Sequence, residues 1–518
     1  MVHGYGGGPG GTEHSCENPR RRSSTEDPKS DEFGFVAKAF ADAGYDVWFA
    51  YYTTSYLSTP SLEVNARCLH NQIAYILKRL DATRVTLVAH SMGGLVSRAY
   101  IEGSEFERPM DVERLITLGT PHKGIPNFIL DGLVVFLKGS FWFLPNFATK
   151  DCTSLATYGP CQMRESYVTH FFNKSHSPRT DLRYDLVGGD ADEPVSKAAF
   201  SGAQNDGLVS VESASRVLSG SLIHNWVTTA SHFDWRVFKT PSYFTEGPPY
   251  RCMKALSAPQ KNGGDGCNLI SPTLSVSHKL LSTMQTPARG PRGVVSLPIR
   301  YGTSYAGDLV TLPFIIDGTD ATLIVQMDRD CNFEWKLPGG QSVDASTLGT
   351  ILPGAQYTWE SVNGTFVAAY KIPNPPPGEW HAIIRDVGSD LHYIVTGQLT
   401  TAVALSLDDL SAGSPGGDVA VRALLTASGA PIVDAEVTAM LIDDRTESQA
   451  RLRSNGDGVY SGIINAPPTP GIYYVRIIAR GRYDGVQFER ESEVSLLVMD
   501  PRSAVTGSAL RRGTGCQW

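Results

Sequence analysis

The sequence contains no run of the roughly 20 apolar residues that a membrane-spanning helix needs, so we expect no membrane span. It also has no extended basic region. The formal net charge is −8, and the only compact basic run, Arg20 to Arg22, is typical of a solvated loop. These absences argue against a nucleic-acid partner and for an ordinary globular protein. At 518 residues the chain is too long for one core, and about two to four domains are expected.

No Cys-x-x-Cys pair occurs among the eight cysteines, which argues against a zinc site or thioredoxin-type redox chemistry. Cys152 and Cys161 bracket a short loop, and Cys252 and Cys267 bracket a glycine-rich one. This spacing predicts two local disulfides and an oxidising compartment. The alternative is a set of scattered buried thiols. The eight are Cys16, Cys68, Cys152, Cys161, Cys252, Cys267, Cys331 and Cys516.

The pattern of apolar residues changes once, near residue 255. Before this point strands and amphipathic helices alternate. One predicted helix is capped by Thr59, has Pro60 at its first position, and carries an apolar stripe that ends at Leu80. Alternating strands and helices predict a parallel sheet covered on both faces, and therefore an α/β domain over residues 1–255.

Beyond Pro259 the helical pattern disappears. Residues 256–290 are a connector rich in glycine, proline and serine, and short alternating strands separated by turn residues follow. Two blocks, 291–402 and 403–500, are predicted to be antiparallel β-sandwiches, the second of them immunoglobulin-like. In the first block the dipeptide NG and the run PPPG are expected to break hairpin strands. Residues 501–518 show no periodicity and are expected to form a tail.

The segment RVTLVAHSMGGLVSRAY places a serine between a buried strand and a helix. The strand ends at Ala89, a tight turn carries Ser91, and the helix begins immediately behind it. This arrangement is the nucleophile elbow, in which the serine hydroxyl is held at the upper edge of the sheet. Strand and helix approach closely there. Ala89 accordingly stands where the pentapeptide usually has its first glycine, and Gly93 and Gly94 follow the serine.

Four segments of the chain resemble blocks of a known family, in the family's order. The family is the bacterial secreted lipases with the α/β-hydrolase fold, in particular the Pseudomonas and Burkholderia type. The segments are VHGYGG, LVAHSMGGLVSRAY, LITLGTPHKG and QNDGLVSVESA. The resemblance covers about residues 1–240. It implies an α/β-hydrolase domain that cleaves lipid or other ester substrates, at an interface.

A serine hydroxyl is a poor nucleophile at neutral pH, so a base must take its proton and an acid must orient that base. In the resembling fold these residues follow in the order Ser, Asp, His. The resemblance implies Asp206 as the acid, although Asn-Asp-Gly is also a common turn. Asp190 and Asp192 are the reserve candidates. The resemblance also implies His232, which follows a predicted strand, as the base. His224, which precedes that strand, is the alternative candidate.

When Ser91 attacks, the carbonyl oxygen becomes an anion that two fixed backbone N–H groups must meet. The resemblance implies Met92, directly after the nucleophile, and Tyr5, directly after an early His-Gly pair. In this fold the loop that bears Tyr5 follows a central strand, of which only Met1 and Val2 are present. We therefore expect the coding frame to extend upstream into a strand of about five apolar residues, preceded by a secretion signal.

A lid-like insertion is predicted at about 125–175. Its first part holds far more apolar residues than an exposed segment should. A lipase would use such a piece as a lid that closes over the site in water and opens onto lipid. An ordinary buried cap helix is the alternative.

The resemblance also implies a structural calcium ion near the predicted base. Asp234, two residues after His232, stands at the family's position, and Asp190 or Asp192 would supply a second carboxylate, because calcium prefers hard oxygen ligands. The alternative is that Asp234 caps a helix without a metal. The hydrolysis itself requires no cofactor.

These observations predict a secreted serine carboxylester hydrolase that forms an acyl-enzyme, with lipase as the expected activity. A polyester depolymerase or a phospholipid acyl hydrolase with the same triad is an alternative within the class. An alternative of another class is a surface-binding protein with a retired hydrolase domain. All three catalytic residue types occur at compatible positions, which favours an enzyme. The sequence indicates no partner for the β-sandwiches.

Overall fold

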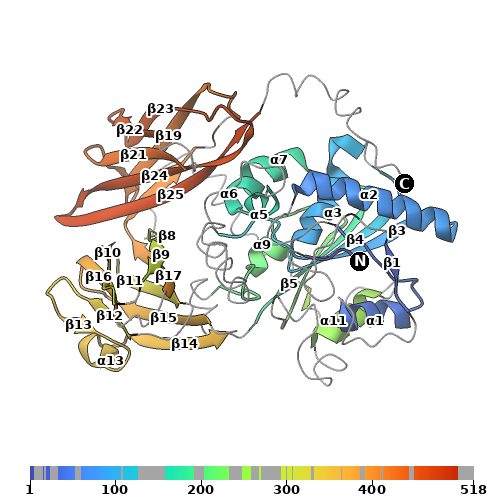
Figure 1. Cartoon of the computed structure of the whole chain (residues 1–518), viewed down its shortest axis with the longest axis horizontal. Helices are drawn as coiled ribbons and strands as arrows, with labels where there is room; N and C mark the ends of the chain where they lie inside the picture. The colour runs from blue at the N-terminus through green and yellow to red at the C-terminus, as the bar shows by residue number, and fades with distance from the viewer. Residues whose placement is uncertain are drawn as a thin grey trace. The chain divides into compact units, whose positions relative to one another are not determined.

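The computed structural model describes residues 1–4, 16, 19–23, 33–52, 60–106, 109–126, 158–191, 203–230, 232, 248–257, 268–269, 293–298, 300–305, 307–327, 332–362, 365–385, 391–408, 410, 412–442 and 448–499. They form two compact units, one up to residue 269 and one from residue 293. In Figure 1 the first unit runs from blue to green and the second from yellow to red. None of the helices in these ranges is long and apolar enough to cross a membrane.

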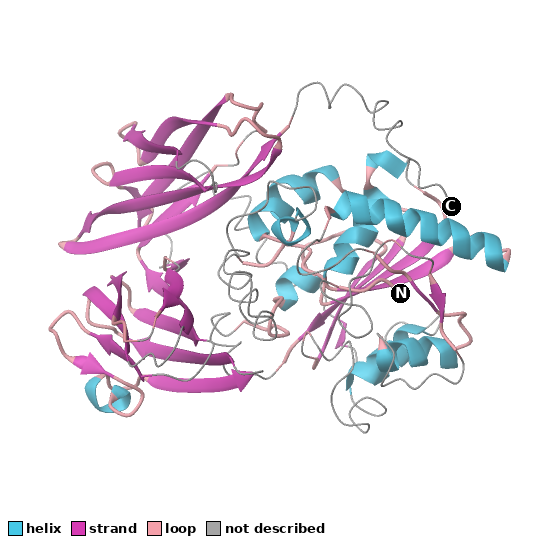
Figure 2. Ribbon diagram, viewed as in Figure 1, coloured by secondary structure: helices cyan, strands magenta, loops and turns pink. Residues whose placement is uncertain are grey.

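A mainly parallel β-sheet forms the centre of the first unit (Figure 2). Its order is β3-β4-β5-β6-β7, in which only β7 runs antiparallel to its neighbour. The central strands β4 and β5 are almost entirely buried, as expected for a sheet with helices on both faces. The strands are β3 Val85–His90, β4 Val112–Leu118, β5 Arg183–Gly189, β6 Ile223–Thr228 and β7 Asn268–Leu269.

The first two residues of the chain lie beside β3. Val2 forms single parallel bridges to Ala89 of β3 and to Ala50. Ala50 directly follows β2 (Trp48–Phe49), which pairs antiparallel with β1 (Arg20–Arg21). Val2 therefore connects this small ribbon to the central sheet.

Helices cover the sheet on both faces, with α2 and α3 on one side and α1 and α11 on the other (Figure 1). Apolar side chains of α1 and α11, such as Phe40 and Met253, share a core with Val88 and Ile116 of the sheet. The larger helices are α1 Gly34–Asp42, α2 Leu62–Leu80, α3 Met92–Glu102, α9 Val211–Ser215 and α11 Pro248–Ser257. The shorter ones are η2 Ser104–Phe106, α5 Tyr158–Gln162, α6 Glu165–Tyr167, the π-helical turn η3 Val168–Phe172 and α7 Asn173–Ser175.

Helix α2 begins later than the sequence predicts. Its N-cap is Ser61, whose backbone is extended (ψ 158°) and whose hydroxyl accepts the N–H of Val64 at 3.3 Å. The hydroxyl satisfies an N–H that has no partner within the helix, which is why the helix starts here. Pro60 precedes the helix, and Thr59 lies outside the described residues. The apolar stripe also ends early, because Leu80 in the last turn is 38% exposed.

All four cysteines in the described part of the chain are in disulfide bonds. Cys16 bonds to Cys68 on α2, at a sequence separation of 52 residues, a pair that the sequence analysis did not predict. Cys161 and Cys252 are also disulfide-bonded, to partners outside the described residues. Each belongs to one of the two predicted pairs, whose pairing stays a prediction. The alternative of scattered buried thiols is wrong for these four cysteines.

Within residues 293–401 two antiparallel sheets enclose one core. Their orders are β10-β16-β12-β13 and β14-β15-β11-β17-β8, with β9 also on β17. Trp335, Trp380 and Val395 are fully buried between them, as in a β-sandwich. The elements are β8 Gly293–Ser296, β9 Arg300–Ser304, β10 Val310–Ile316, β11 Asp320–Met327, β12 Asn332–Lys336, β13 Ser342–Val343, α13 Leu348–Ile351, β14 Gln356–Val362, β15 Thr365–Pro373, β16 Gly378–Arg385 and β17 Leu391–Thr401.

The two turn signals of this domain have different outcomes. Strands β14 and β15 pair as an antiparallel hairpin, with Val362 opposite Thr365 on either side of the NG dipeptide. The predicted break at PPPG is confirmed, because β15 ends at Pro373 and β16 begins at Gly378. The two strands belong to different sheets, however, so the prediction that they form a hairpin is wrong. Proline has no N–H to donate to a ladder, and residues 375–377 instead carry the chain from one sheet to the other.

Residues 403–498 form a single antiparallel sheet that folds over itself into a nearly closed sandwich. The order is β18-β19-β23-β22-β21-β24-β25, with β20 on β19. Strand β22 joins the halves, because Leu452 pairs with β21 while Arg453 pairs with β23. The strands are β18 Val403–Leu407, β19 Asp418–Ala427, β20 Ala430–Pro431, β21 Glu436–Ile442, β22 Ser448–Ser454, β23 Val459–Asn465, β24 Gly471–Tyr483 and β25 Val486–Val498. The predicted fold class, an α/β unit followed by antiparallel β domains, is confirmed.

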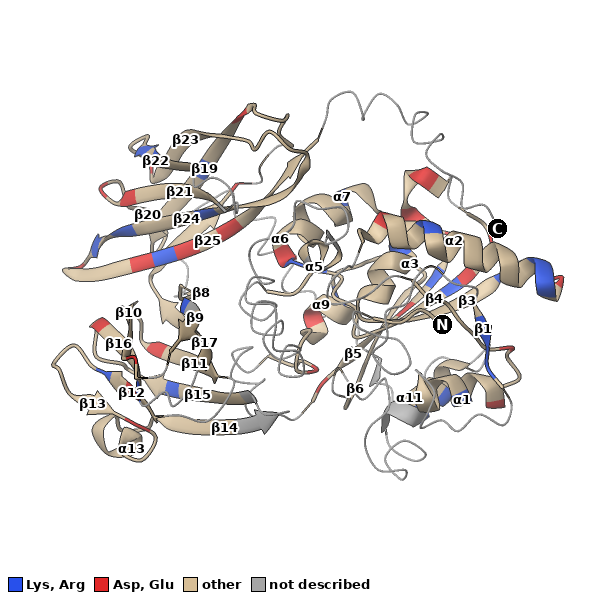
Figure 3. Cartoon of the chain, in the orientation of Figure 1, with Lys and Arg blue, Asp and Glu red and all other residues tan. Residues whose placement is uncertain are grey.

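Ion pairs join these two β domains, which belong to one compact unit. Acidic and basic residues alternate along β25 (Figure 3). Glu489 of β25 bonds to Arg300 of β9 at 2.8 Å, and the next residue, Arg490, bonds to Asp317 at 2.5 Å. The side chains of Arg490 and Asp317 are only 1% and 6% exposed, so removal of one partner would leave a buried charge.

The Cys16–Cys68 bond leads to a test of the first unit's stability. Cross-linking residues 52 positions apart restricts the unfolded chain, and for a loop of this length the chain-entropy estimate is about 4 kcal/mol. We expect the double variant Cys16→Ser, Cys68→Ser to lose about this free energy of unfolding. Calorimetry without reductant measures it. An unchanged melting transition of the first unit would contradict the expectation.

Candidate active site

Ser91 lies between the last residue of β3 and the first of α3. Its backbone has φ 53° and ψ −127°, a region that a residue other than glycine enters only at a free-energy cost of about 1–3 kcal/mol. The Ser91 N–H donates to the carbonyl of Leu118 at the end of β4, at 3.0 Å, and helix α3 begins at the next residue. The side chain therefore stands at the carboxyl edge of the parallel sheet.

Close packing behind the serine explains one of the glycines of the elbow. A Cβ on Gly93 would lie 2.3 Å from the carbonyl oxygen of His3 and 2.6 Å from that of Val2. The early His-Gly pair also borders the serine, because a Cβ on Gly4 would lie 2.8 Å from Ser91 Cβ. The start of the chain and the elbow are thus in contact, and Gly93 leaves room for the backbone of residues 2 and 3.

The structure brings Ser91, His232 and Asp206 together. His232 Nε2 lies 3.0 Å from Ser91 Oγ, and His232 Nδ1 lies 2.8 Å from Asp206 Oδ2. A carboxylate only accepts hydrogen bonds, so Nδ1 carries the proton and Nε2 accepts the serine hydroxyl. The three residues are 5%, 3% and 1% exposed. Chemically, the arrangement is a nucleophile with a neutral base oriented by a buried acid.

Asp206 is oriented by the turn that it begins. Its Oδ1 accepts the backbone N–H groups of Leu208 and Val209 at 3.1 and 2.7 Å. This leaves Oδ2 for His232. The backbone N–H of His232 in turn donates to the Asp206 carbonyl at 2.6 Å, so the acid and the base are joined by main chain as well as by side chain. The Asn-Asp-Gly segment is therefore a turn and the carrier of this carboxylate at once.

Gly119, directly after β4, lies against the same pair. Its φ is +57°, and a Cβ there would lie 2.6 Å from Asp206 Oδ2 and 3.1 Å from His232 Nδ1. Any side chain would press on the hydrogen bond between the acid and the base. Glycine is therefore required by both the backbone conformation and the space.

The rival and reserve candidates lie elsewhere or outside the described residues. His224 is inside β6, opposite Asp185, near the start of that strand rather than at the carboxyl edge.

Met92, the predicted oxyanion donor, is fully buried and is the first residue of α3, so its backbone N–H belongs to the first turn, where no intrahelical partner exists. Tyr5, Asp192, Asp234 and the apolar part of the lid-like insertion, 127–157, lie outside the described residues.

The predicted calcium set is represented by Asp190 alone. Its carboxylate accepts the side-chain amide of Gln204 at 2.7 Å. Among the described residues no group of three or more His, Cys, Asp or Glu side chains is placed to hold a metal ion. The calcium site therefore stays a prediction.

Sequence reasoning missed three residues around the triad. His90 Nε2 donates to the carbonyl of His232 at 2.9 Å, and Gly119 and His122 lie in the loop after β4. A signal was present, because the segment GTPHKG follows β4 as Ser91 follows β3. The carboxyl ends of parallel strands meet at one edge of a sheet, where sites of α/β proteins form.

The elbow, the strand order and the helices on both faces identify the first unit's architecture. The fold is that of the α/β-hydrolases. The profile of the PGAP1-like alpha/beta domain matches residues 47–139, which include β3, Ser91 and α3. The serine of the site thus lies inside the matched stretch, while Asp206 and His232 lie beyond it.

Solved structures include a similar chain that spans both units. A lipase from Bacillus licheniformis in its propeptide form is 16% identical, with a TM-score of 0.54, over 97% of this chain and 93% of that one. The mature form of that lipase is 21% identical, with a TM-score of 0.30, over 45% of this chain and 83% of that one. A search of curated proteins found no match. At these identities the likeness to the propeptide form shows the fold alone.

The contact behind the elbow predicts the effect of one substitution. Gly93→Ala should lower the free energy of unfolding of the first unit by at least about 2 kcal/mol, because backbone carbonyls cannot move aside as a flexible side chain would. Gly220→Ala, also in the first unit, is the control, since a Cβ there meets only the end of the Ile223 side chain, at 3.3 Å. Calorimetry of both variants measures the difference. Equal stability of Gly93→Ala and wild type would show that the start of the chain does not pack here.

Proposed function

We propose that this chain is a serine carboxylester hydrolase with lipase activity. One observation carries the proposal. Ser91, on the elbow after β3, is hydrogen-bonded to His232, which is hydrogen-bonded in turn to Asp206. A serine at positive φ and a buried carboxylate both cost free energy. A constellation of this kind is expected where a nucleophile must be activated. It favours an active enzyme over a retired hydrolase domain.

In the proposed first step Ser91 Oγ forms a bond to the ester carbonyl carbon while His232 Nε2 takes the hydroxyl proton. Asp206 holds the imidazole by accepting Nδ1–H and stabilises the imidazolium. The charge that develops on the carbonyl oxygen meets the backbone N–H of Met92 and, in this proposal, that of Tyr5. The intermediate then collapses, the ester C–O bond breaks, and the alcohol leaves with the proton from His232.

The second step returns the enzyme to its starting state. A water molecule gives a proton to His232 and attacks the acyl-enzyme, and the same N–H groups meet the oxyanion. The bond between Ser91 and the acyl group breaks, Ser91 recovers its proton from His232, and the acid leaves. No cofactor enters these steps, and a structural calcium ion at Asp234 would contribute stability and no chemistry.

Acylglycerol esters are the proposed substrates because four sequence blocks resemble the Pseudomonas and Burkholderia lipases. A polyester depolymerase or phospholipid acyl hydrolase would use the same residues, so substrate tests must separate these activities. The Cys16–Cys68 bond supports the proposal of a secreted protein, because disulfides persist in oxidising compartments.

Removal of the nucleophile is the first test of the proposal. Ser91→Ala should lower the hydrolysis of p-nitrophenyl butyrate by at least about 10⁴-fold and abolish covalent labelling by a fluorophosphonate. Ser104→Ala, at an exposed serine just after α3, should retain both. Undiminished turnover by Ser91→Ala would end the proposal.

A substrate series tests the proposed specificity and the lid. We expect rates to rise from butyryl to palmitoyl esters and to jump when the substrate passes from dissolved to emulsified, if the 125–175 insertion is a lid. A smooth saturation curve would favour the buried cap helix. Faster cleavage of polyester films or phospholipid vesicles than of triacylglycerol emulsions would contradict lipase as the main activity.

A further inference from the structure

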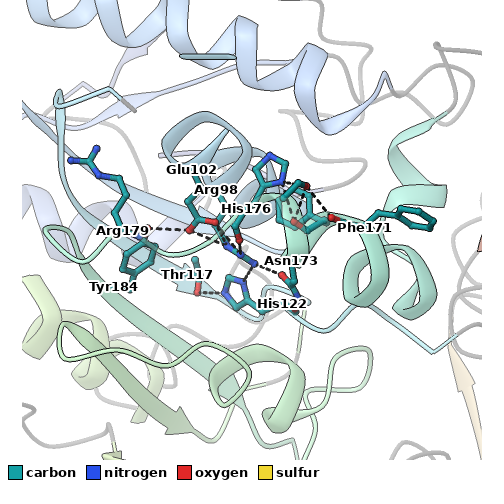
Figure 4. Close-up of polar contacts among 11 residues, drawn as sticks. Arg98, Glu102, Thr117, His122, Phe171, Asn173, His176, Arg179 and Tyr184 are labelled. Atoms are coloured by element: carbon teal, nitrogen blue, oxygen red, sulfur yellow. Dashed lines mark hydrogen bonds and ion pairs between the residues drawn. The ribbon is translucent and has the colours of Figure 1, made fainter. Parts of the chain in front are cut away.

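A buried polar network lies behind the elbow, around the second half of α3 (Figure 4). Its centre is Arg98, which is fully buried. The guanidinium donates to the Glu102 carboxylate at 3.0 Å, to Asn173 Oδ1 at 2.9 Å and to the His176 carbonyl at 2.9 Å. Its Nη1 also faces His122 Nδ1 at 3.5 Å. The positive charge is balanced by Glu102, whose side chain is equally buried.

These contacts determine the protonation of His122. A guanidinium can only donate, so Nδ1 is the acceptor and the ring proton is on Nε2, which lies 3.0 Å from Thr117 Oγ1. The ring is therefore neutral. Burial, and then the charge of Arg98, lower the pKa of His122 well below its usual value. A second proton would face the guanidinium with another cation.

The backbone of His122 reaches the segment that carries the acid. Its N–H donates to the Ser213 carbonyl at 3.1 Å, and the N–H of Lys123 donates to Ser213 Oγ at 3.1 Å. Ser213 Oγ in turn donates to the Gly124 carbonyl at 2.9 Å. Ser213 belongs to α9, which follows the turn of Asp206. The network therefore connects α3, which starts behind Ser91, to the support of the acid.

The loop after β4 that carries His122 and Lys123, residues 119–124, also contacts the triad through its first residue. Gly119 packs on the hydrogen bond between Asp206 and His232. The next residue, Thr120, packs on α3, since a Cβ on Gly94 would lie 2.1 Å from Thr120 Oγ1. Residues 119–124 thus contact the helix of the nucleophile, the pair of acid and base, and α9.

We propose that Arg98 and neutral His122 are positioning residues, which hold the loop 119–124 so that Asp206 and His232 stay aligned with Ser91. Neither residue contacts the reacting atoms. The inference rests on the proposed function where it concerns rate. Its other consequence, acid sensitivity of the first unit, is independent of any substrate.

The sign of this acid sensitivity follows from the network. A histidine that stays neutral when folded contributes stability that is fully present above about pH 6.5, the range of the unfolded side chain. This stability is lost as the pH falls below that value. The charged groups around His122 are Arg98 and Glu102 on α3 and Lys123 in the loop, which pairs with Glu165 and Glu212. His176, whose carbonyl accepts from Arg98, also has a pKa lowered by burial, but it is present in both wild type and His122→Asn, so the comparison of the two isolates His122. None of these carboxylates bonds to the His122 ring in the described contacts.

The rate experiment compares variants per active site, titrated with a fluorophosphonate. His122→Leu removes the acceptor for Arg98 and should lower kcat for p-nitrophenyl butyrate at least about 10-fold with little change in KM. His122→Asn keeps a neutral acceptor and donor and should stay within about 1.5-fold of wild type. If His122→Leu fails to fold, Thr117→Val, which removes the partner of Nε2, takes its place with a loss of about threefold.

The stability experiment follows the melting temperature of the first unit. Between about pH 8 and pH 5.5 wild type should lose about 3 to 5 °C more than His122→Asn, which cannot be protonated in this range. His70→Asn, at an exposed histidine of α2, is the control and should behave as wild type.

Each outcome decides the proposal. A normal kcat per active site in His122→Leu or, in its absence, in Thr117→Val would overturn positioning. So would equal losses in His122→Leu and His122→Asn, or identical pH shifts in wild type and His122→Asn. If wild type neither hydrolyses esters nor reacts with the fluorophosphonate, the proposed function fails, and the melting experiment alone then decides whether His122 must be neutral.

Discussion

The conformation of Ser91 is the constraint on which the rest of the site depends. A positive φ lifts the hydroxyl above the edge of the sheet and sends the chain at once into α3. The turn is tight enough that the carbonyls of residues 2 and 3 fill the space beside Gly93. The cost is offset by the bond from the Ser91 N–H to Leu118 and by the packing of α3, all of whose residues are buried. The neighbouring strands then bring Gly119 and the acid to the same edge.

Buried ion pairs lie at two places in the first unit, one on α3 and one in the central sheet. Near the site Arg98 and Glu102 form an ion pair with both side chains fully buried. Near the amino-terminal ends of the central strands, Arg114 of β4 bonds to Asp185 of β5 at 2.6 Å. Arg114 also donates to the Leu256 carbonyl at the end of α11. Burial alone would raise the pKa of Asp185, but the bonds from Arg183 and Arg114 outweigh it and lower the pKa. Each buried charge thus has a partner of opposite sign, as the cost of an unpaired charge requires, and the pair of Arg114 and Asp185 also joins two strands.

Each of the two β domains has its own apolar core. The contacts described for the triad are those within the first unit. Polar contacts lie at the junction between the β domains. Arg490 forms an ion pair with Asp317 at 2.5 Å and donates a hydrogen bond to the Val403 carbonyl at 3.0 Å. Removal of either charged partner would leave the other buried without compensation, so this pair couples the two β domains.

Local patterns sufficed for the features that depend on neighbours in the chain. The elbow was predictable because strand, turn and helix are contiguous around Ser91, and the change from α/β to β near residue 255 because side-chain periodicity follows the local backbone. The acid and the base, Asp206 and His232, were predicted from the resemblance to a family.

Tertiary structure decided which groups meet. His232 is 26 residues from Asp206 and 141 from Ser91 along the chain. His90, Gly119 and His122 gain their contacts only when separate strand ends meet at one edge of the sheet. Likewise PPPG had the composition of a turn, and only the pairing of β16 with β10 and β12 showed that it links two sheets. A sequence pattern reports the local backbone, whereas these contacts depend on the packing of distant segments.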